Sequence, residues 1–220
     1  MKHVVIDLEF SDVVDKTIRK TLEHTNKEIV QIGAVMLNDA VEIIDEFVCY
    51  VRPAYGPVSK NCTRITGITN EDVKNAKLLE DCVRDFVAWI GNERSDTYIY
   101  AWSGTDYQQL HGEMLQKHIY IEEMDDLFLR WNDFQKQFEE LLEYPWQLSL
   151  KHAVSALDLK FEGTQHSALD DARNTAKIFA LSKDEKEFKK RTDAIREVIV
   201  PTPDEVPVGD IFKKAFYGQG

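Results

Sequence analysis

The chain has 220 residues, 43% of them hydrophobic, which suits one large domain with a real core. No run of about 18 apolar residues is present, so a membrane-spanning helix is excluded, and we read no signal peptide before the first strand and expect a cytoplasmic protein. The net charge of −12 argues against a protein that coats nucleic acid through a basic surface. It does not argue against an enzyme that holds a few nucleotides at a metal site.

The cysteines are odd in number and widely spaced. Cys49, Cys62 and Cys82 lie too far apart for a C-x-x-C clip, which makes a thiolate zinc site improbable. We therefore expect all three to be reduced thiols in the core, as is usual in a reducing compartment.

The first predicted element is a buried strand at residues 4–10, VVIDLEF, which carries Asp7 and Glu9 two positions apart. Side chains on a strand alternate between its faces, so both carboxylates point the same way. Burying two like charges is costly unless a cation neutralises them, and hard divalent ions such as Mg²⁺ prefer carboxylate oxygens. The alternative is that one side chain faces solvent and the other caps a turn.

Two antiparallel strands are predicted next. The polar stretch at 11–27 predicts a loop or short helix, in a position usual for segments that contact substrate. Residues 28–38, EIVQIGAVMLN, form an apolar, β-branched run, and a third strand over 41–53 follows the turn at Asn38 and Asp39. Strands joined so tightly are antiparallel neighbours.

Helices and strands then alternate. Residues 53–68 are predicted to be irregular, Thr69 and Asp72 form a capping box, and the apolar spacing over 78–90 predicts an amphipathic helix. A fourth strand is predicted at 97–104 and a short fifth strand at 127–131, with helices from Asp106 and over 134–142, 150–159 and 166–181. Asp133 and Ser149 are predicted N-caps. This order predicts an α/β fold with a mixed sheet flanked by helices.

The composition changes near residue 182, so we divide the chain into a domain at 1–182 and an extension at 183–220. Residues 184–198 balance opposite charges at helical spacing and predict a solvated helix. Three prolines and a small apolar stripe follow: Pro201, Pro203, Pro207, Ile211, Phe212, Ala215 and Phe216. Two readings stay open, a tail that docks on its own domain and a tail that binds a protein partner.

Two further aspartates are placed to join Asp7 and Glu9. Asp106 follows the fourth strand, and Asp171 lies in the first turns of the last helix of the domain. Strand ends and helix starts at one edge of a sheet can converge on a single site. Four carboxylates there could hold two metal ions about 3.5–4 Å apart, one to activate water and one to stabilise the leaving oxygen in a phosphoryl displacement.

The segment HSALDDA contains two adjacent aspartates with different predicted roles. Ser167 and Asp170 are spaced as a capping box, which gives Asp170 a local structural role. Asp171 points about 100° away around the helix and is free to face the sheet. His166 lies just outside the helix, where it could act as a general base toward water or be a surface imidazole.

These residues resemble the DEDDh group of 3′–5′ exonucleases, which have a ribonuclease H-like fold. In that group an Asp-x-Glu, an Asp after the fourth strand and a His-x4-Asp carry catalysis, and here DLE, WSGTD and HSALDD match them in order. The sequence is similar in particular to the exoribonuclease subfamily that regulates RNA interference and trims histone-mRNA 3′ ends, through EIVQIGAVMLN, EFVCYVRP, ITGIT and HSALDDARNTAKIF. The resemblance covers residues 1–182.

The resemblance implies a ribonuclease H-like mixed five-stranded sheet, with two Mg²⁺ or Mn²⁺ ions bound by Asp7, Glu9, Asp106 and Asp171, and His166 as the base. Its implied reaction removes nucleoside 5′-monophosphates from single-stranded 3′ ends, with RNA favoured over DNA. The alternatives are a DNA exonuclease of proofreading type and a catalytically silent relative that binds nucleic acid or a partner.

The chain departs from the subfamily in two respects. We find no separate RNA-binding module, so the RNA targets of eukaryotic members do not transfer. The segment after Glu9 reads FSDVVD where many relatives place small residues or Thr, which predicts a different nucleotide pocket. Phe10 and Trp102 are the candidates for stacking on terminal bases, with a core position as the alternative for Trp102.

Overall fold

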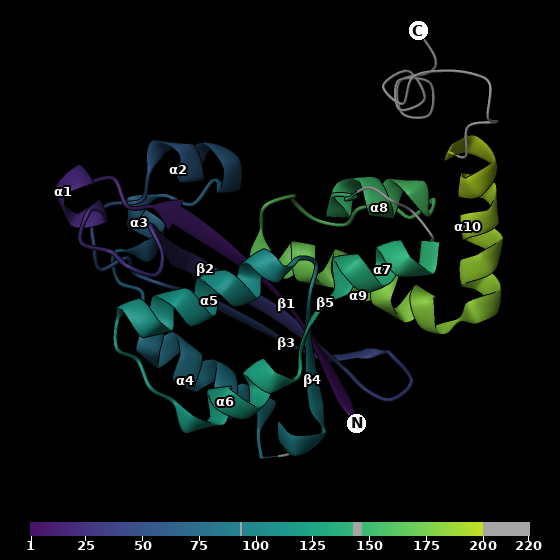
Figure 1. Ribbon diagram of the computed structural model, residues 1–220, viewed down its shortest axis with the longest axis horizontal. Coiled ribbons are helices and arrows are strands. Elements are labelled where there is room, and N and C mark those ends of the chain that lie inside the picture. Colours follow the sequence, from purple (N-terminus) through teal and green to yellow (C-terminus); the bar gives the residue numbers. More distant parts are fainter. Residues whose placement is uncertain (93, 143–146, 200–220) are drawn as a thin grey trace, which may run out of the picture.

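The computed structural model describes residues 1–92, 94–142 and 147–199, and Figure 1 shows a twisted sheet with helices on both faces. Five strands form this sheet in the order β3-β2-β1-β4-β5. The β1–β2 and β2–β3 pairs are antiparallel, whereas β4 is parallel to both β1 and β5. The predicted mixed five-stranded sheet is therefore confirmed. The strands are β1 (Lys2–Asp12), β2 (Lys27–Leu37), β3 (Ile43–Tyr50), β4 (Thr97–Ala101) and β5 (Trp131–Asp133).

Helices of the two faces enclose two large apolar cores (Figure 1). The first core lies between the sheet and α4 (Leu79–Ile90), α5 (Gly104–Gln116) and α6 (Glu122–Leu129). The second lies on the opposite face, under α7 (Phe134–Leu142), α8 (Leu150–Ala156), α9 (Ala168–Lys183) and α10 (Glu185–Ile199).

The alternation of β1 decides where its carboxylates point. Val4, Ile6 and Leu8 pack in the first core, whereas Val5 packs in the second. Asp7 and Glu9 continue the face of Val5, because side chains two positions apart share a face of a strand. Both carboxylates therefore point to the side of the sheet that α9 covers.

The segments between the strands form a third, smaller cluster. It joins Val30 of β2 to α2 (Lys60–Thr66), α3 (Asn70–Val73) and the loops that flank them, and α1 (Lys16–Arg19) lies near the same end of β1 (Figure 1). Its buried members are Val30, Val58, Cys62, Ile68 and Val73. The predicted capping box of Thr69 and Asp72 is present and begins α3.

Two local predictions are wrong. Residues 127–131 are not a strand, because α6 continues to Leu129 and β5 begins only at Trp131. Residues 53–68 are not wholly irregular, because α2 begins after Ser59, whose Oγ accepts a hydrogen bond from the Cys62 N–H at 3.1 Å. Gly67 ends α2 with a φ of 77°, the left-handed conformation that favours glycine after a helix.

The prediction of three reduced thiols is also wrong. Cys49 of β3 and Cys82 of α4 form a disulfide across a Cα–Cα distance of 6.2 Å, and Cys62 is a free, buried thiol. The pairing joins residues 33 positions apart, a separation that no local spacing rule detects. The cytoplasmic location, which was expected because no signal peptide was read, stays a prediction.

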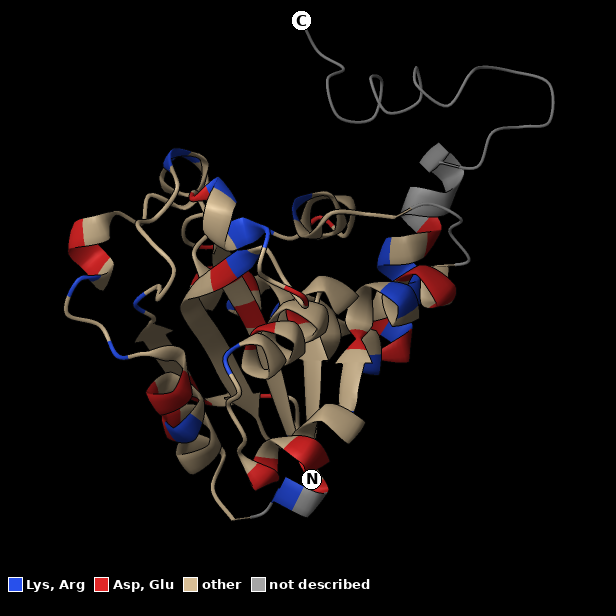
Figure 2. Cartoon of the chain, turned by 60° about the vertical axis from the view of Figure 1, so that its left-hand side comes forward, with Lys and Arg blue, Asp and Glu red and all other residues tan. Residues whose placement is uncertain are grey.

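The extension begins with the predicted helix, α10, along which acidic and basic residues are interspersed (Figure 2). Phe188 is buried and packs edge-on against Phe138 of α7, and Arg191 Nη1 donates to the carbonyl oxygen of Leu157 at 2.8 Å. This part of the extension therefore docks on the domain. The predicted proline and apolar positions at 201–216 lie outside the described residues. Among the described helices, none combines the length and apolar character needed to cross a membrane.

Gly33 sets the distance between α9 and the sheet, and this gives a first prediction. A Cβ atom at Gly33 would lie 2.2 Å from the backbone nitrogen of Leu169 and 2.3 Å from the carbonyl carbon of Ala168. Gly33→Ala should therefore push α9 away from β2 and lower the free energy of unfolding by roughly 1–3 kcal/mol or more. Urea denaturation measures the loss.

The matched control is Gly112→Ala in α5. There a Cβ atom would have its nearest contact at 3.5 Å, an ordinary van der Waals distance. This substitution should be neutral or stabilise the protein by up to about 1 kcal/mol, because alanine is the better helix former. Equal stability of the two variants would contradict the role assigned to Gly33.

Candidate active site

A cavity of about 380 Å³ opens where β1 and β4 end. It brings together all five residues predicted to be catalytic, from three separate parts of the chain: Asp7, Glu9, Asp106, His166 and Asp171. Both predicted stacking residues, Phe10 and Trp102, also line it. The structure thus places every predicted site residue in the lining of one cavity.

β1 supplies the first pair of carboxylates. Asp7 is partly buried and Glu9 is buried, at the point where the β1–β2 register shifts between Glu9 and Phe10. Such an irregularity bends the strand locally and changes the direction of the side chains that follow it. Glu9 is the last residue of β1 before this shift, and pairing resumes with Phe10 opposite Ile29.

Asp106 is fixed to β1 from the start of α5. Ser103 is the N-cap of this helix, so Asp106 lies in its first turn, where a negative charge is favoured. The buried Asp106 carboxylate accepts a hydrogen bond from the backbone N–H of Leu8 through Oδ1 at 3.1 Å. Leu8 lies between Asp7 and Glu9, so this bond places the third carboxylate beside the first two.

Asp171 reaches the same place from α9. The helix starts against β2, where Gln31 Oε1 accepts a hydrogen bond from the backbone N–H of Ala168 at 3.0 Å. Asp171 then lies in the first turn and accepts the backbone N–H of His166 through Oδ2 at 3.0 Å. One carboxylate therefore faces the site and also holds the residue predicted to be the base.

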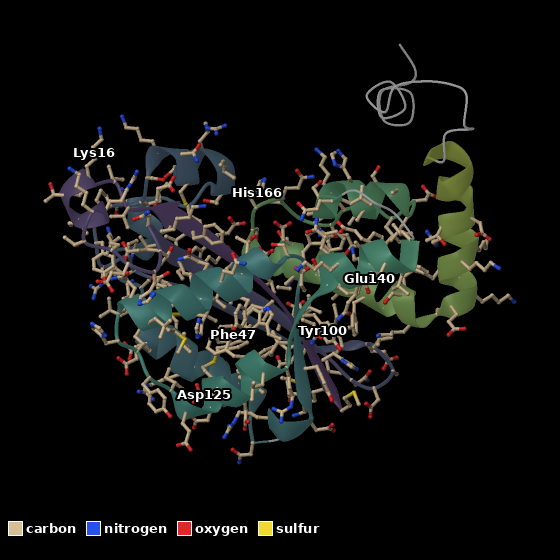
Figure 3. All side chains as sticks on the ribbon, viewed as in Figure 1. Lys16, Phe47, Tyr100, Asp125, Glu140 and His166 are labelled. Atoms are coloured by element: carbon tan, nitrogen blue, oxygen red, sulfur yellow. A yellow bond between two sulfur atoms is a disulfide. The ribbon has the colours of Figure 1, made fainter. Side chains whose placement is uncertain are left out.

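His166 is exposed, on the loop that leads from α8 into α9 (Figure 3). Its φ of 64° is left-handed, which is uncommon for a residue other than glycine and costs about 1–3 kcal/mol at strained sites. One ligand atom each from Glu9, His166 and Asp171 lie within 4.8 Å of one another. The imidazole is therefore within reach of the carboxylates.

The predicted capping box of Ser167 and Asp170 is wrong. Ser167 is the N-cap of α9, but its side chain makes no capping hydrogen bond. Asp170 instead accepts the backbone N–H of Thr164 at 2.9 Å and Arg173 Nη1 at 2.8 Å. Asp170 does have a structural role, as predicted, but it holds the loop before His166 rather than the helix end.

This loop is also linked to the sheet edge. Arg173 forms two hydrogen bonds to the Glu46 carboxylate of β3, with Nε and Nη2 as donors. Gly163 has a φ of 80°, and a Cβ atom there would lie 2.3 Å from the carboxyl carbon of Asp170. The contact thus requires glycine at 163, and it ties the path of the chain toward His166 to β3.

Burial raises the pKa of all four carboxyl groups, and repulsion from the other site carboxylates adds to the rise at Asp7 and Glu9. The pKa of Asp7 is well above its usual value, first through burial and then through the charges of Asp106, Asp171 and Glu9. Burial, with Asp171 and Asp106, raises the pKa of Glu9 to about 8. Burial raises the pKa of Asp106 to about 7 and that of Asp171 to about 6, against the hydrogen bonds that each accepts from the backbone.

The donor set suits hard divalent cations. Within the described part of the chain, no lysine or arginine forms an ion pair with any of the four carboxylates. Oxygen ligands of this kind prefer Mg²⁺ or Mn²⁺, and such ions would offset the repulsion that raises the pKa values. Asp7, Glu9, Asp106 and Asp171 are the residues that would hold them.

The two predicted stacking residues have different surroundings. Trp102 is 7% exposed, its ring packs against Phe134 and Phe138, and its Nε1 donates to the carbonyl oxygen of Leu148 at 3.1 Å. These contacts favour the core position for Trp102. Phe10 is partly buried, and the ammonium group of Lys27 lies 4.7 Å from the centre of its ring.

The sequence analysis did not predict the contributions of α2 and β2 to the cavity lining. α2 supplies Asn61, Ile65 and Thr66, and β2 supplies Lys27. The Ser59 and Gly67 boundary signals would have predicted α2. No local signal would have placed Lys27 here, because its position follows from the pairing of β2 with β1.

The chain matches known nucleases over most of its length. A family model described as Exonuclease, of the RNase T type, matches residues 4–179. ERI1 exoribonuclease 2 of Xenopus laevis is 30% identical over 197 residues, which cover 80% of this chain and 27% of the relative. The probable 3′–5′ exonuclease KapD of Bacillus subtilis (strain 168) is 28% identical over 192 residues, covering 86% of this chain and 87% of that protein.

The fold has a close counterpart among solved structures. The nuclease domain of 3′hExo, a DEDDh family member bound to rAMP, superposes with a TM-score of 0.70 at 22% identity. The match covers 84% of this chain and 94% of that domain. The chain spans about a quarter of the length of the ERI1 exoribonuclease 2 relatives. From the family match at residues 4–179, the chain belongs to the RNase T family of exonucleases, and it has the ribonuclease H-like fold of the DEDDh nuclease domain.

Proposed function

We propose that this chain shortens single-stranded RNA from its 3′ end, in preference to DNA, and releases nucleoside 5′-monophosphates with the help of two Mg²⁺ or Mn²⁺ ions. The observation that carries the proposal is the convergence of four carboxylates and His166 on one open cavity. The preference for RNA is supported by the name of the exoribonuclease relative and by the rAMP in the similar nuclease domain.

Bound ions of this class supply a nucleophilic water at neutral pH and charge stabilisation for an in-line displacement at phosphorus. Asp7, Glu9, Asp106 and Asp171 would hold the ions, which agrees with the metal dependence of DEDDh nucleases. The same carboxylates would repel a phosphodiester without cations, so the protein alone cannot seat the substrate.

His166 takes the proton from the attacking water. The new bond joins the water oxygen to phosphorus, and the bond from phosphorus to the 3′ oxygen of the shortened strand breaks. The released nucleotide keeps the 5′ phosphate. The loop that Asp170 and Asp171 hold from both sides fixes the backbone of His166, while the exposed imidazole remains free to accept a proton.

The direct test compares RNA and DNA oligonucleotides of one sequence, each labelled at the 5′ end, with Mn²⁺ and with EDTA. We expect stepwise shortening from the 3′ end only with metal, and faster on RNA, whereas Asp7→Asn should be inactive. Faster shortening of DNA would favour the proofreading-type alternative. Binding without shortening of either strand would favour the catalytically silent alternative.

Metal removal gives a prediction about stability. The folded protein raises the pKa of Glu9 to about 8, of Asp106 to about 7 and of Asp171 to about 6, whereas unfolded carboxyl groups titrate near ~4. The folded state therefore binds more protons, and its stability falls as pH rises from about 5 toward 8. In EDTA the Tm should fall over this range, and Mn²⁺ should reduce the fall.

Asp7→Asn is the control for this measurement. It removes one charge from the cluster, so in EDTA its Tm should fall less steeply with pH than that of the wild type. Mn²⁺ should also stabilise it less. The same slope in both proteins would show that the cluster does not control the pH dependence.

A further prediction concerns His166→Ala. General-base contributions are typically about 10²–10⁴-fold, so kcat should fall by that factor. The ascending limb of the pH profile should flatten, because a base must be neutral to accept the proton. Stabilisation by Mn²⁺, measured by thermal denaturation, should stay near the wild-type value. A loss of Mn²⁺ binding as severe as in Asp7→Asn would instead make His166 a metal ligand.

A further inference from the structure

Among the described residues that line the cavity, Lys27 is the only lysine or arginine. Its side chain is exposed, and the ammonium group lies over the ring of Phe10, 4.7 Å from the ring centre. Among the described residues, no carboxylate forms an ion pair with it, although Asp12 is its partner across β1 and β2. A cation is thus held at the cavity by an aromatic face rather than by an acidic side chain.

The backbone of Lys27 is fixed by the helix that carries Asp106. Gln109 Nε2 donates to the carbonyl oxygen of Lys27 at 3.1 Å, and Glu113 Oε2 accepts the backbone N–H of Ile29 at 2.7 Å. Gln109 lies less than one turn after Asp106, and Glu113 one turn further. α5 therefore sets the start of β2 relative to the carboxylate site.

This anchor is itself rigid. Glu113 is fully buried and forms an ion pair with Lys117, whose Nζ lies 2.7 Å from Glu113 Oε1 and 2.8 Å from Glu28 Oε1. Glu28, the residue after Lys27, also accepts the backbone N–H groups of Ala54 and Tyr55. Breaking the buried ion pairs of Lys117 would cost free energy, so the main chain at Lys27 has little freedom to move.

The charge balance of the cavity calls for a cation at this place. Two divalent ions would offset the four carboxylates but leave the charge of the scissile phosphate uncompensated, and Asp12 also lines the cavity. The protein carries a net charge of −12, so the next phosphodiester of a bound strand would face a repelling surface. The ammonium group of Lys27, which is paired with Asp12 across the two strands, counters that repulsion.

We propose that Lys27 binds the phosphodiester immediately 5′ of the scissile one, and that Phe10 is the platform that holds its ammonium group. This inference rests on the proposed exonuclease function. It also revises the role predicted for Phe10, because the ammonium group of Lys27 lies over one side of its ring and Phe10 packs against the first core.

The experiment compares Lys27→Met with the wild type, as full chains with Mn²⁺, on two oligonucleotides of one sequence. One has only phosphodiesters, and the other has an uncharged methylphosphonate at the second linkage from the 3′ end. The readout is release of the first 3′-terminal nucleotide. Methionine keeps the unbranched stem over Phe10 and removes the charge.

On the unmodified strand, Lys27→Met should raise KM roughly three- to tenfold with kcat little changed, since one charged contact is lost. The slope of log KM against log salt concentration should fall by about 0.7, as expected for one phosphate contact on a single strand. On the methylphosphonate strand the variant and the wild type should have the same KM. Lys27→Arg should resemble the wild type on both strands.

Lys16→Met is the matched control, because Lys16 is an exposed cation of α1 that does not line the cavity. It should leave KM on both strands unchanged. If Lys27→Met raises KM equally on both strands, or lowers kcat instead, Lys27 does not bind this phosphodiester. An unchanged KM and salt slope would overturn the proposal as well.

The two proposals fail in different ways. If the wild type releases no nucleotide from the unmodified strand, the exonuclease function is wrong and the role of Lys27 falls with it. If the wild type is active and Lys27→Met matches it on both strands, only the assignment of Lys27 is wrong.

Discussion

The contact between α9 and β2 decides whether the carboxylates of this protein form a site at all. Gly33 pairs with Asp7 across the two central strands, and its missing side chain lets the backbone of α9 come down onto the sheet. Gln31 then satisfies a backbone N–H at the start of α9. Asp171 reaches Asp7 and Glu9 only because these two β2 residues admit the helix, so a strand that carries none of the four carboxylates controls how they come together.

The same contact brings buried carboxylates together, which destabilises the folded protein, and the packing of the apolar cores offsets this cost. Folding buries four carboxylates in one cavity without a lysine or arginine ion pair among the described residues, and this burial raises their pKa values, with mutual repulsion adding to the rise at Asp7 and Glu9. The left-handed φ of His166 adds local strain. Sites of this kind are not optimised for the stability of the empty protein, and the packing on both faces of the sheet holds them in place.

The parts predicted from the sequence are those with a local signal. Alternation along VVIDLEF placed Asp7 and Glu9 on one face, and the spacing of the three motifs identified Asp106, His166 and Asp171. The errors occur where partners are distant in sequence or signals are short. Asp170 contacts Thr164 and Arg173 instead of Ser167, Cys49 pairs with Cys82, and the apolar run at 127–131 continues a helix. No rule of spacing contains these tertiary contacts.

The third apolar cluster gives the cavity wall at α2 a foundation of its own. Val58, Cys62 and Ile68 pack there with Val30 and Val73, apart from the two large cores that hold the carboxylates. α2 contributes to the cavity but carries none of the metal-site residues. Substitutions on its exposed side can therefore alter which nucleotide fits without moving an acidic group. Nucleotide preference can then change during evolution while the reaction chemistry stays the same.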